Sequence, residues 1–324
     1  MSALSRLSTV LTEGQLDVAG KTVCVIRPPA GYDISSLPRD GVTVHHTFKP
    51  DVAAWEAGGY RVSADVSNCD VAIVVVPRAK ALARSLIASA CAKAKIVVVD
   101  GAKTDGIDSL FKACRKVLGD LPTLTKDHGR IFWFHTTDAF AAWAAPAPSR
   151  DAHGYITTAG VFSDGAIDKG SAFLVEVLPP KLPARIADLG AGWGFLAHHI
   201  LTREGVAHLD LIEAEALALD CARQNVSDPR ARFLWADATT FAPPTPYDGI
   251  VMNPPFHTAR AADPALGRTF IRAAAAMLTP NGKLWMVANR HLPYEHALSE
   301  AFRTVDMIAQ NNAFKVFHAI RPKR

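Results

Sequence analysis

The sequence lacks the features that mark secreted, membrane-spanning and zinc-binding proteins. Its five cysteines are odd in number and form no CxxC pair, so we expect reduced thiols without a disulfide framework or a zinc site. No apolar stretch reaches the roughly 18–20 residues that span a bilayer. The N-terminal stretch has no basic segment followed by an apolar one, so we expect no signal peptide and a cytoplasmic protein.

Metal-ligand spacing and strong net charge are also missing. The twelve histidines show no HExxH-like pattern, and no metal site is predicted. The net charge is +4, and the excess lies in residues 1–150, which carry 18 Lys and Arg against 14 Asp and Glu. It is concentrated in residues 93–130. A solvated helix face explains so modest an excess, and a surface that contacts phosphates is the alternative.

Short apolar runs alternate with helical segments along the chain. In the first half, strands are predicted at residues 21–29, 41–48, 69–77, 94–101 and 130–136, and helices at residues 78–94 and 106–119. In the second half, strands are predicted at residues 184–190, 208–214, 231–237, 247–256, 283–289 and 312–322, and helices at residues 195–204, 215–226 and 265–282. This alternation of β-branched runs with helices is typical of βαβ units around a mostly parallel sheet.

The Pro- and Ala-rich stretch "APAPSRDAHG" separates the two halves, so we predict domains at residues 1–150 and 151–324. The halves share a weak repeat: "CDVAIVVVP" in the first resembles "YDGIVMNPP" in the second. The first copy lacks the asparagine, the second proline and any Gly-rich turn. Either the halves are duplicates of which only the second kept a ligand site, or the similarity is that of any two α/β domains.

A Gly-rich turn, "DLGAGWG", follows the first strand of the second half. Gly190 and Gly192 let the backbone turn sharply and approach a ligand closely. Three acids end successive strands: Asp188 before the turn, Glu213, and Asp237. A carboxylate at the second position accepts hydrogen bonds from ribose hydroxyls, and one at the third reaches an adenine amino group.

The negative charge of Asp188 favours one of two classes of ligand that bind at such a turn. A dinucleotide would place its pyrophosphate at this turn, where the carboxylate repels it. A ligand with a cationic end suits the site better, and S-adenosylmethionine (SAM) has an ammonium group, a sulfonium, a ribose and an adenine but no phosphate.

The fourth strand of this half ends in "NPPF". The side-chain oxygen of Asn253 and the carbonyl of Pro254 are two acceptors for the two N–H bonds of a planar amine, and they aim its lone pair at a methyl group. The prolines fix the backbone that carries both acceptors. Phe256 offers a face on which a base stacks.

With these motifs the chain resembles the class I SAM-dependent methyltransferases. It is similar to the ribosomal RNA guanine-N2 methyltransferases of the RsmC type, with the RlmG enzymes close behind. The resemblance rests on "GVFSDGAIDKGSAFLVEVLP", "NPPFH", "VANRHLPYE" and "FKVFHAIR", with a looser match at "GAKTDGIDSLFK". It implies two tandem Rossmann-like methyltransferase domains. The first is degenerate and serves RNA binding and support, and the second is catalytic.

The resemblance also implies the site residues. SAM contacts are expected at Asp188, Gly190, Gly192, Glu213, Asp237 and Asn253, and the active site at Asn253, Pro254 and Phe256. Trp193, inside the turn, is bulkier than expected and is predicted to tighten the pocket. His257, Arg290 and Tyr294 are candidate RNA contacts, and Phe162 either covers the cofactor or belongs to the core.

The hypothesis is methyl transfer from SAM to the N2 amine of a guanine in 16S ribosomal RNA, by a monomer that acts on the RNA or a ribosomal subunit. The alternatives are a guanine in 23S RNA, a protein glutamine or a DNA adenine. A ribosome assembly factor that kept the pocket without catalysis is the non-enzymatic alternative.

Overall fold

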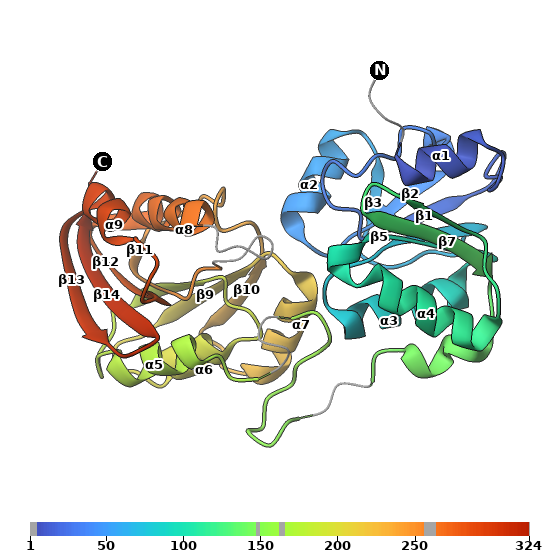
Figure 1. Ribbon diagram of the computed structural model, residues 1–324. Helices are drawn as coiled ribbons and strands as arrows, with labels where there is room; N and C mark the ends of the chain where they lie inside the picture. Colours follow the sequence, from blue (N-terminus) through green and yellow to red (C-terminus); the bar gives the residue numbers. More distant parts are fainter. Residues whose placement is uncertain (1–4, 147–149, 162–165, 256–263, 324) are drawn as a thin grey trace. The chain divides into compact units, whose positions relative to one another are not determined.

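The computed structural model describes residues 5–146, 150–161, 166–255 and 264–323. The chain forms two compact units, residues 1–147 and 148–324, and each has its own central sheet flanked by helices (Figure 1). No helix in the described part is long and apolar enough to cross a membrane.

The N-terminal unit is built on a seven-stranded sheet with the order β3-β2-β1-β4-β5-β7-β6. Its strands are β1 (Val23–Ile26), β2 (Val42–His45), β3 (Arg61–Ser63), β4 (Val71–Val75), β5 (Ile96–Ala102), β6 (Thr123–Lys126) and β7 (Gly129–His135). Its helices are α1 (Arg6–Thr12), α2 (Lys49–Ala57), α3 (Lys80–Lys93) and α4 (Ile107–Leu118), with 3-10 turns at Arg39–Gly41, Lys103–Asp105 and Asp138–Trp143.

The C-terminal unit repeats this plan with the order β10-β9-β8-β11-β12-β14-β13. Its strands are β8 (Arg185–Leu189), β9 (His208–Glu213), β10 (Ala231–Trp235), β11 (Tyr247–Met252), β12 (Leu278–Asn289), β13 (Phe302–Gln310) and β14 (Phe314–Pro322). Its helices are α5 (Lys169–Val177), α6 (Phe195–Leu201), α7 (Ala216–Asn225), α8 (Pro264–Met277) and α9 (Glu295–Ala301). Strands β8 to β12 are parallel, and β14 runs antiparallel to both its neighbours.

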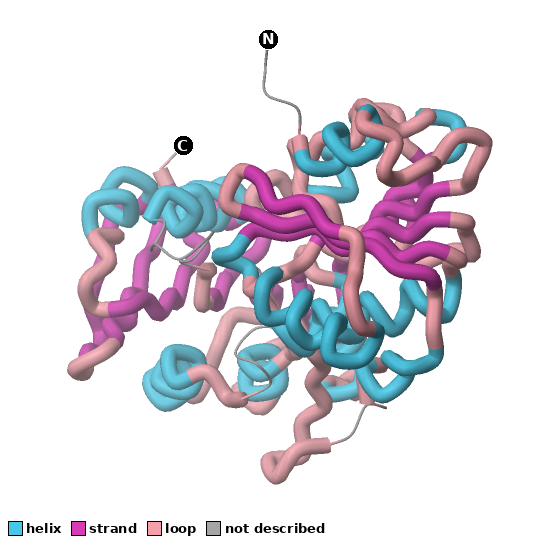
Figure 2. Tube along the Cα trace, turned by 45° about the vertical axis from the view of Figure 1, so that its right-hand side comes forward, coloured by secondary structure: helices cyan, strands magenta, loops and turns pink. Residues whose placement is uncertain are grey.

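The identical strand order of the two sheets confirms the predicted pair of Rossmann-like domains. In each unit the strand added last in sequence lies between the sixth and fifth strands and closes the sheet with an antiparallel pair. The tube view shows these strands as layers between helices (Figure 2). The internal repeat in the sequence therefore corresponds to a repeat of topology.

Each face of the C-terminal sheet has its own apolar core. Residues of α8 and α9, including Phe270 and Leu298, pack on one face, and residues of α5, α6 and α7, including Leu174 and Ile200, pack on the other. The central strands β8 and β11 are almost wholly buried, as continuous apolar runs require. Their carboxyl ends are thereby held rigidly at one edge of the sheet.

Two sequence expectations about element ends are corrected. The helix expected at residues 265–282 ends at Met277, and the following residues begin β12. The Asn281-Gly282 pair thus lies within the strand rather than at a helix end. The pairing of β11 with β12 shifts register between Tyr247 and Gly249, which accommodates the extra residues of β12.

Asp210 in β9 is a buried carboxylate that joins β9 to β10 and β11 in the C-terminal unit. Its carboxylate accepts hydrogen bonds from Arg232 Nε and Nη2, both at 2.9 Å, and from the Tyr247 hydroxyl, and His208 Nε2 lies 2.8 Å away. Burial works against its ionisation, but the bonds from Arg232 and Tyr247 outweigh burial and lower its pKa.

We expect Asp210→Asn to lower the free energy of unfolding by about 2–3 kcal/mol, because it removes one partner of a buried network while Arg232 keeps partial access to water. The exposed Asp220→Asn is the control and is expected to change it by less than about 0.5 kcal/mol. Urea unfolding of both variants measures the difference. Equal stabilities would show that the Asp210 network contributes nothing.

Candidate active site

The Gly-rich turn lies between β8 and α6. Gly190 and Gly192 have φ angles of 72° and 55°, in the left-handed region that favours glycine. The Gly190 amide donates to the carbonyl of Ile212 at the end of β9, at 2.9 Å. The turn is thus held against the neighbouring strand, as the sequence motif requires.

Asp188, near the end of β8, is fully buried, and neither of its carboxylate oxygens has a hydrogen-bond partner among the described residues. Burial and, to a smaller extent, the nearby Glu213 raise its pKa to about 8, against a smaller lowering by the amide of Ala197 in α6. An unpartnered buried carboxylate is costly. Its position fits a ligand that brings positive charge to the turn.

Glu213, the last residue of β9, holds the turn in shape. Its Oε2 accepts a hydrogen bond from the Gly192 amide at 2.7 Å, and its Oε1 accepts one from the Glu215 amide at 2.8 Å. Burial raises its pKa. Each carboxylate oxygen has a second lone pair, so both remain able to accept from ligand hydroxyls.

Asp237 follows β10 and closes a short turn. Its Oδ1 accepts hydrogen bonds from the Thr239 amide at 2.8 Å and the Thr239 hydroxyl at 2.7 Å. Both bonds go to one oxygen, which leaves Oδ2 as the acceptor for a ligand.

Asn253 follows β11 directly. Its Nδ2 donates to Asp168 Oδ1 at 2.7 Å and to Ser171 Oγ at 2.9 Å, both in the first turn of α5. The adjoining Pro254 is buried. Asp168 and Ser171 were not among the predicted site residues. They lie in "DKGS", and the only local signal is that aspartate is a preferred helix N-cap.

Strand pairing brings these groups to one edge of the sheet. Leu189 of β8 is paired with Ile212 of β9 on one side and with Met252 of β11 on the other. The residues that follow these three partners are Gly190, Glu213 and Asn253. The candidate site is therefore the carboxyl edge of adjacent parallel strands, where α/β sheets bind their ligands.

The remaining predicted residues differ in their support. Trp193 packs against Tyr155 and Phe195, with ring centroids 4.9 and 5.7 Å away, so it anchors the segment before α5. That it tightens the pocket stays a prediction. Tyr294 is 1% exposed, which argues against a direct contact with RNA. Arg290 is exposed just beyond β12. The predictions at Phe162, Phe256 and His257 concern residues outside the described part of the chain.

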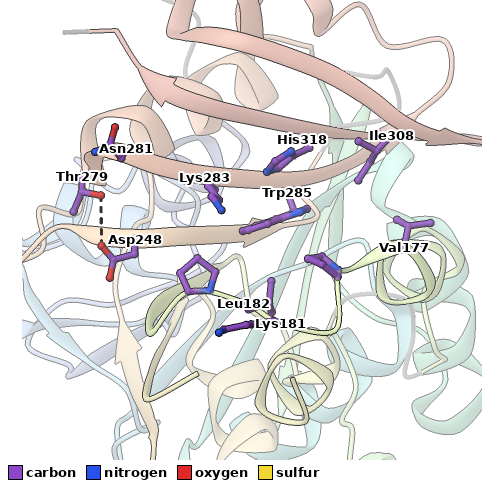
Figure 3. Close-up of a pocket in the computed structure, with 12 residues that line it drawn as sticks. Val177, Lys181, Leu182, Asp248, Thr279, Asn281, Lys283, Trp285, Ile308 and His318 are labelled. Atoms are coloured by element: carbon purple, nitrogen blue, oxygen red, sulfur yellow. Dashed lines mark hydrogen bonds between the residues drawn. The ribbon is translucent and has the colours of Figure 1, made fainter. Parts of the chain in front are cut away.

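A pocket of about 690 Å³ lies at the opposite end of the same sheet. Its lining includes Asp248, which is the second residue of β11, and Trp285, whose ring stacks on His318 with centroids 4.9 Å apart (Figure 3). Asp248 and Asn253 are at opposite ends of β11. This pocket is therefore separate from the candidate active site.

The carboxyl edge of the N-terminal sheet has the same strand pairing as that of the C-terminal sheet but carries different residues. Ile26 of β1 pairs with His45 and Val74, as Leu189 pairs with its two neighbours, and Arg27 N donates to His45 O as Gly190 N donates to Ile212 O. The matching positions carry Val25 in place of Asp188, Arg27 in place of Gly190, His46 in place of Glu213 and Val75 in place of Asn253. The first domain is thus degenerate at every one of these four positions.

The profile of the methyltransferase small domain family matches residues 153–318, a little more than half of the chain. The chain belongs to this family. It is 32% identical to a ribosomal RNA small subunit methyltransferase C from Shewanella halifaxensis over 268 residues, 78% of this chain and 77% of the relative. A relative of the same name from Hahella chejuensis is 27% identical over 99% of this chain and 100% of its own length.

The fold also matches a solved structure. A T. thermophilus 16S rRNA N2 methyltransferase (RsmC), in complex with AdoMet and guanosine, superimposes with a TM-score of 0.81 at 22% identity, over 98% of this chain and 92% of its own. These matches confirm the resemblance to the RsmC type that the motifs indicated, and they span both units of this methyltransferase.

Proposed function

We propose that the protein transfers a methyl group from SAM to the exocyclic N2 amine of a guanine in 16S ribosomal RNA. The observation that carries the proposal is the placing of Asn253, with its amide oriented by α5, at the same sheet edge as the Gly-rich turn, Asp188 and Glu213. The names of the relatives support RNA as the substrate and N2 as the acceptor.

The residues of the C-terminal unit fit SAM. We assign the unpartnered carboxylate of Asp188 to the cationic end of the ligand, the Glu213 carboxylate to the ribose hydroxyls, and Asp237 Oδ2 to the adenine amine. Gly190 and Gly192 leave room for a ligand to approach the backbone closely, since neither residue carries a side chain. When bound, SAM supplies an electrophilic methyl group on its sulfonium sulfur.

The chain's own contribution is to orient the amine. The N2 lone pair of guanine is delocalised into the ring, which makes it a poor nucleophile. Acceptors at Asn253 Oδ1 and the Pro254 carbonyl hold the two N–H bonds and direct the lone pair towards the methyl carbon. The N–C bond forms as the S–C bond breaks, the sulfur keeps the bonding electrons, and one N2 proton leaves to solvent.

We assign RNA binding and support to the N-terminal domain. Its degenerate edge leaves it without a SAM site of its own. Its basic segment is partly neutralised, because Lys95, Arg115 and Arg130 form ion pairs with Asp70, Asp120 and Asp108. The lysines of α4 and its flanks, Lys103, Lys112 and Lys116, are the candidates for contact with phosphates.

The test is a methylation assay with tritiated SAM and three acceptors: 16S RNA, 23S RNA and the 30S subunit. Nucleoside mass spectrometry identifies the product, and primer extension locates it. N2-methylguanosine in 16S RNA supports the proposal. Label in 23S RNA, in DNA adenine or in a protein glutamine, or binding to subunits without label, would each replace it with the corresponding alternative.

A further inference from the structure

The donor side of the Asn253 amide is fully engaged by α5. A primary amide has two N–H bonds, and the Nδ2 atom has two acceptors, Asp168 Oδ1 at 2.7 Å and Ser171 Oγ at 2.9 Å. We infer that Asp168 and Ser171 are positioning residues that set the direction of Asn253 Oδ1 towards the methyl acceptor. This inference rests on the proposed function and adds two residues to its machinery.

The network permits only one orientation of the amide. If the Asn253 side chain were flipped, its Oδ1 would face the Asp168 carboxylate, and two acceptors would meet without a hydrogen between them. The shorter of the two bonds is the one to the carboxylate, as expected for a charge-assisted bond. Asn253 therefore turns its oxygen away from α5, which an isolated asparagine at a strand end would do only part of the time.

The first turn of α5 is itself held firmly. Asp168 Oδ1 also accepts the Ser171 amide at 2.8 Å and so caps the helix. Ser171 is 7% exposed. A methyl group added at Gly170 would lie 3.1 Å from the Phe314 ring, so the turn packs tightly against β14. The acceptors for Asn253 thus sit on a packed helix end joined to the sheet.

The Asp168 charge also makes Asn253 a better acceptor. An amide that donates its N–H bonds to a carboxylate carries more negative charge on its oxygen, because hydrogen bonds in a chain polarise one another. Positive charge develops on the amine nitrogen as the N–C bond forms. An oxygen strengthened in this way stabilises the transition state more than the bound substrate, which raises kcat.

Two substitutions at Asp168 distinguish its orientation of the Asn253 amide from the effect of its negative charge. Asp168→Ser keeps a good N-cap, but its side chain is too short to reach Asn253, so the amide loses its main acceptor. Asp168→Asn keeps both the cap and an oxygen acceptor and removes only the charge. Ser171→Ala removes the second acceptor. Asp220→Ser, on an exposed part of α7, is the matched control.

We expect kcat to fall by about 10- to 100-fold in Asp168→Ser and by less in Asp168→Asn and Ser171→Ala. The range is the one found in metal sites when a residue that hydrogen-bonds to a metal ligand, and so orients it, is removed. KM for SAM and the melting temperature should change little. The control should match the wild type. A purely structural role predicts the opposite, a lower melting temperature with kcat preserved in the folded fraction.

A double substitution supplies the sharper test. Asn253→Asp alone places two carboxylates side by side, which raises the pKa of one of them and gives the activity a new pH dependence. Adding Asp168→Asn restores a donor opposite the new carboxylate and should recover at least tenfold of the lost kcat. If the kcat losses of the two single variants simply multiply in the double variant, the two residues act independently and the inference is overturned.

A measurement without catalysis distinguishes this inference from the proposed function. In the free protein, the side-chain amide hydrogens of Asn253, assigned by their loss in Asn253→Ala, should exchange slowly in the wild type and faster in Asp168→Ser. If the wild type methylates no guanine but Asn253 exchanges slowly in the wild type and faster in Asp168→Ser, the proposed function fails. The inference that Asp168 positions Asn253 is then kept, with an amine other than that of guanine as the methyl acceptor. If exchange and kcat are unchanged in Asp168→Ser, the positioning fails while the proposed function survives.

Discussion

Asn253→Ala is expected to lower kcat for methyl transfer by about a thousandfold and to leave SAM affinity nearly unchanged. The substitution removes the oxygen that accepts an N–H of the substrate amine, and the loss of one preorganised transition-state contact of this kind costs about 10²–10³ in rate. The substitution also removes one of the two donors to Asp168 Oδ1, which then accepts only from the Ser171 amide.

Isothermal titration with SAM and single-turnover methylation of 16S RNA measure the two quantities separately. Asn281→Ala is the matched control, since Asn281 is exposed and lines the pocket at the other end of the sheet. The control should retain full activity. Normal turnover in Asn253→Ala would remove Asn253 from the mechanism, and a large loss of SAM affinity would reassign it to the cofactor.

The carboxyl edge of the C-terminal sheet could be predicted because its signals are local. A run of buried residues that stops at Gly190 or at Pro254 marks the end of a strand, and parallel strands place such ends together. The same reasoning predicts that Asp188, Glu213 and Asp237 lie at strand ends. The structure puts each of them at or beside the end of its strand.

What could not be predicted depends on contacts between distant segments. Asp168 and Asn253 are 85 residues apart, and nothing in either neighbourhood indicates the other. The short edge strand β3 has only three residues, and β13 is largely exposed, so neither produces an apolar pattern. The partial neutralisation of the basic segment could not be predicted for a related reason: Asp70, the ion-pair partner of Lys95, is 25 residues away in sequence.

The degenerate edge of the N-terminal unit shows how a repeated fold loses a site. The sequence showed missing motifs, but only strand register identifies what replaced them. Arg27 stands at the position of Gly190 with a φ of 55°, and its guanidinium bonds to Thr47. His46 replaces Glu213, and burial together with the Arg27 charge lowers its pKa to about 3, so it is neutral. Neither can accept ribose hydroxyls as a carboxylate does.

Asp188→Asn is expected to weaken SAM binding about 10- to 100-fold while making the free protein more stable. The carboxylate has an ordinary pKa near 4 in the unfolded chain and about 8 in the folded one, so the folded state holds the extra proton between these values. Wild-type stability therefore falls as pH rises through this window, by at most about 1.4 kcal/mol per pH unit, and levels off above 8.

The asparagine variant has no such proton, so its stability advantage should grow from pH 5 to pH 8, measured by thermal unfolding without SAM. Binding of a cation favours the ionised carboxylate, and wild-type SAM binding should therefore release nearly one proton at pH 7 and almost none at pH 9. Titrations in buffers of different ionisation enthalpy count these protons. Parallel stability curves and no proton release would mean that Asp188 does not face the cationic end of the ligand, and the assignment of that end to the β8 turn would have to be abandoned.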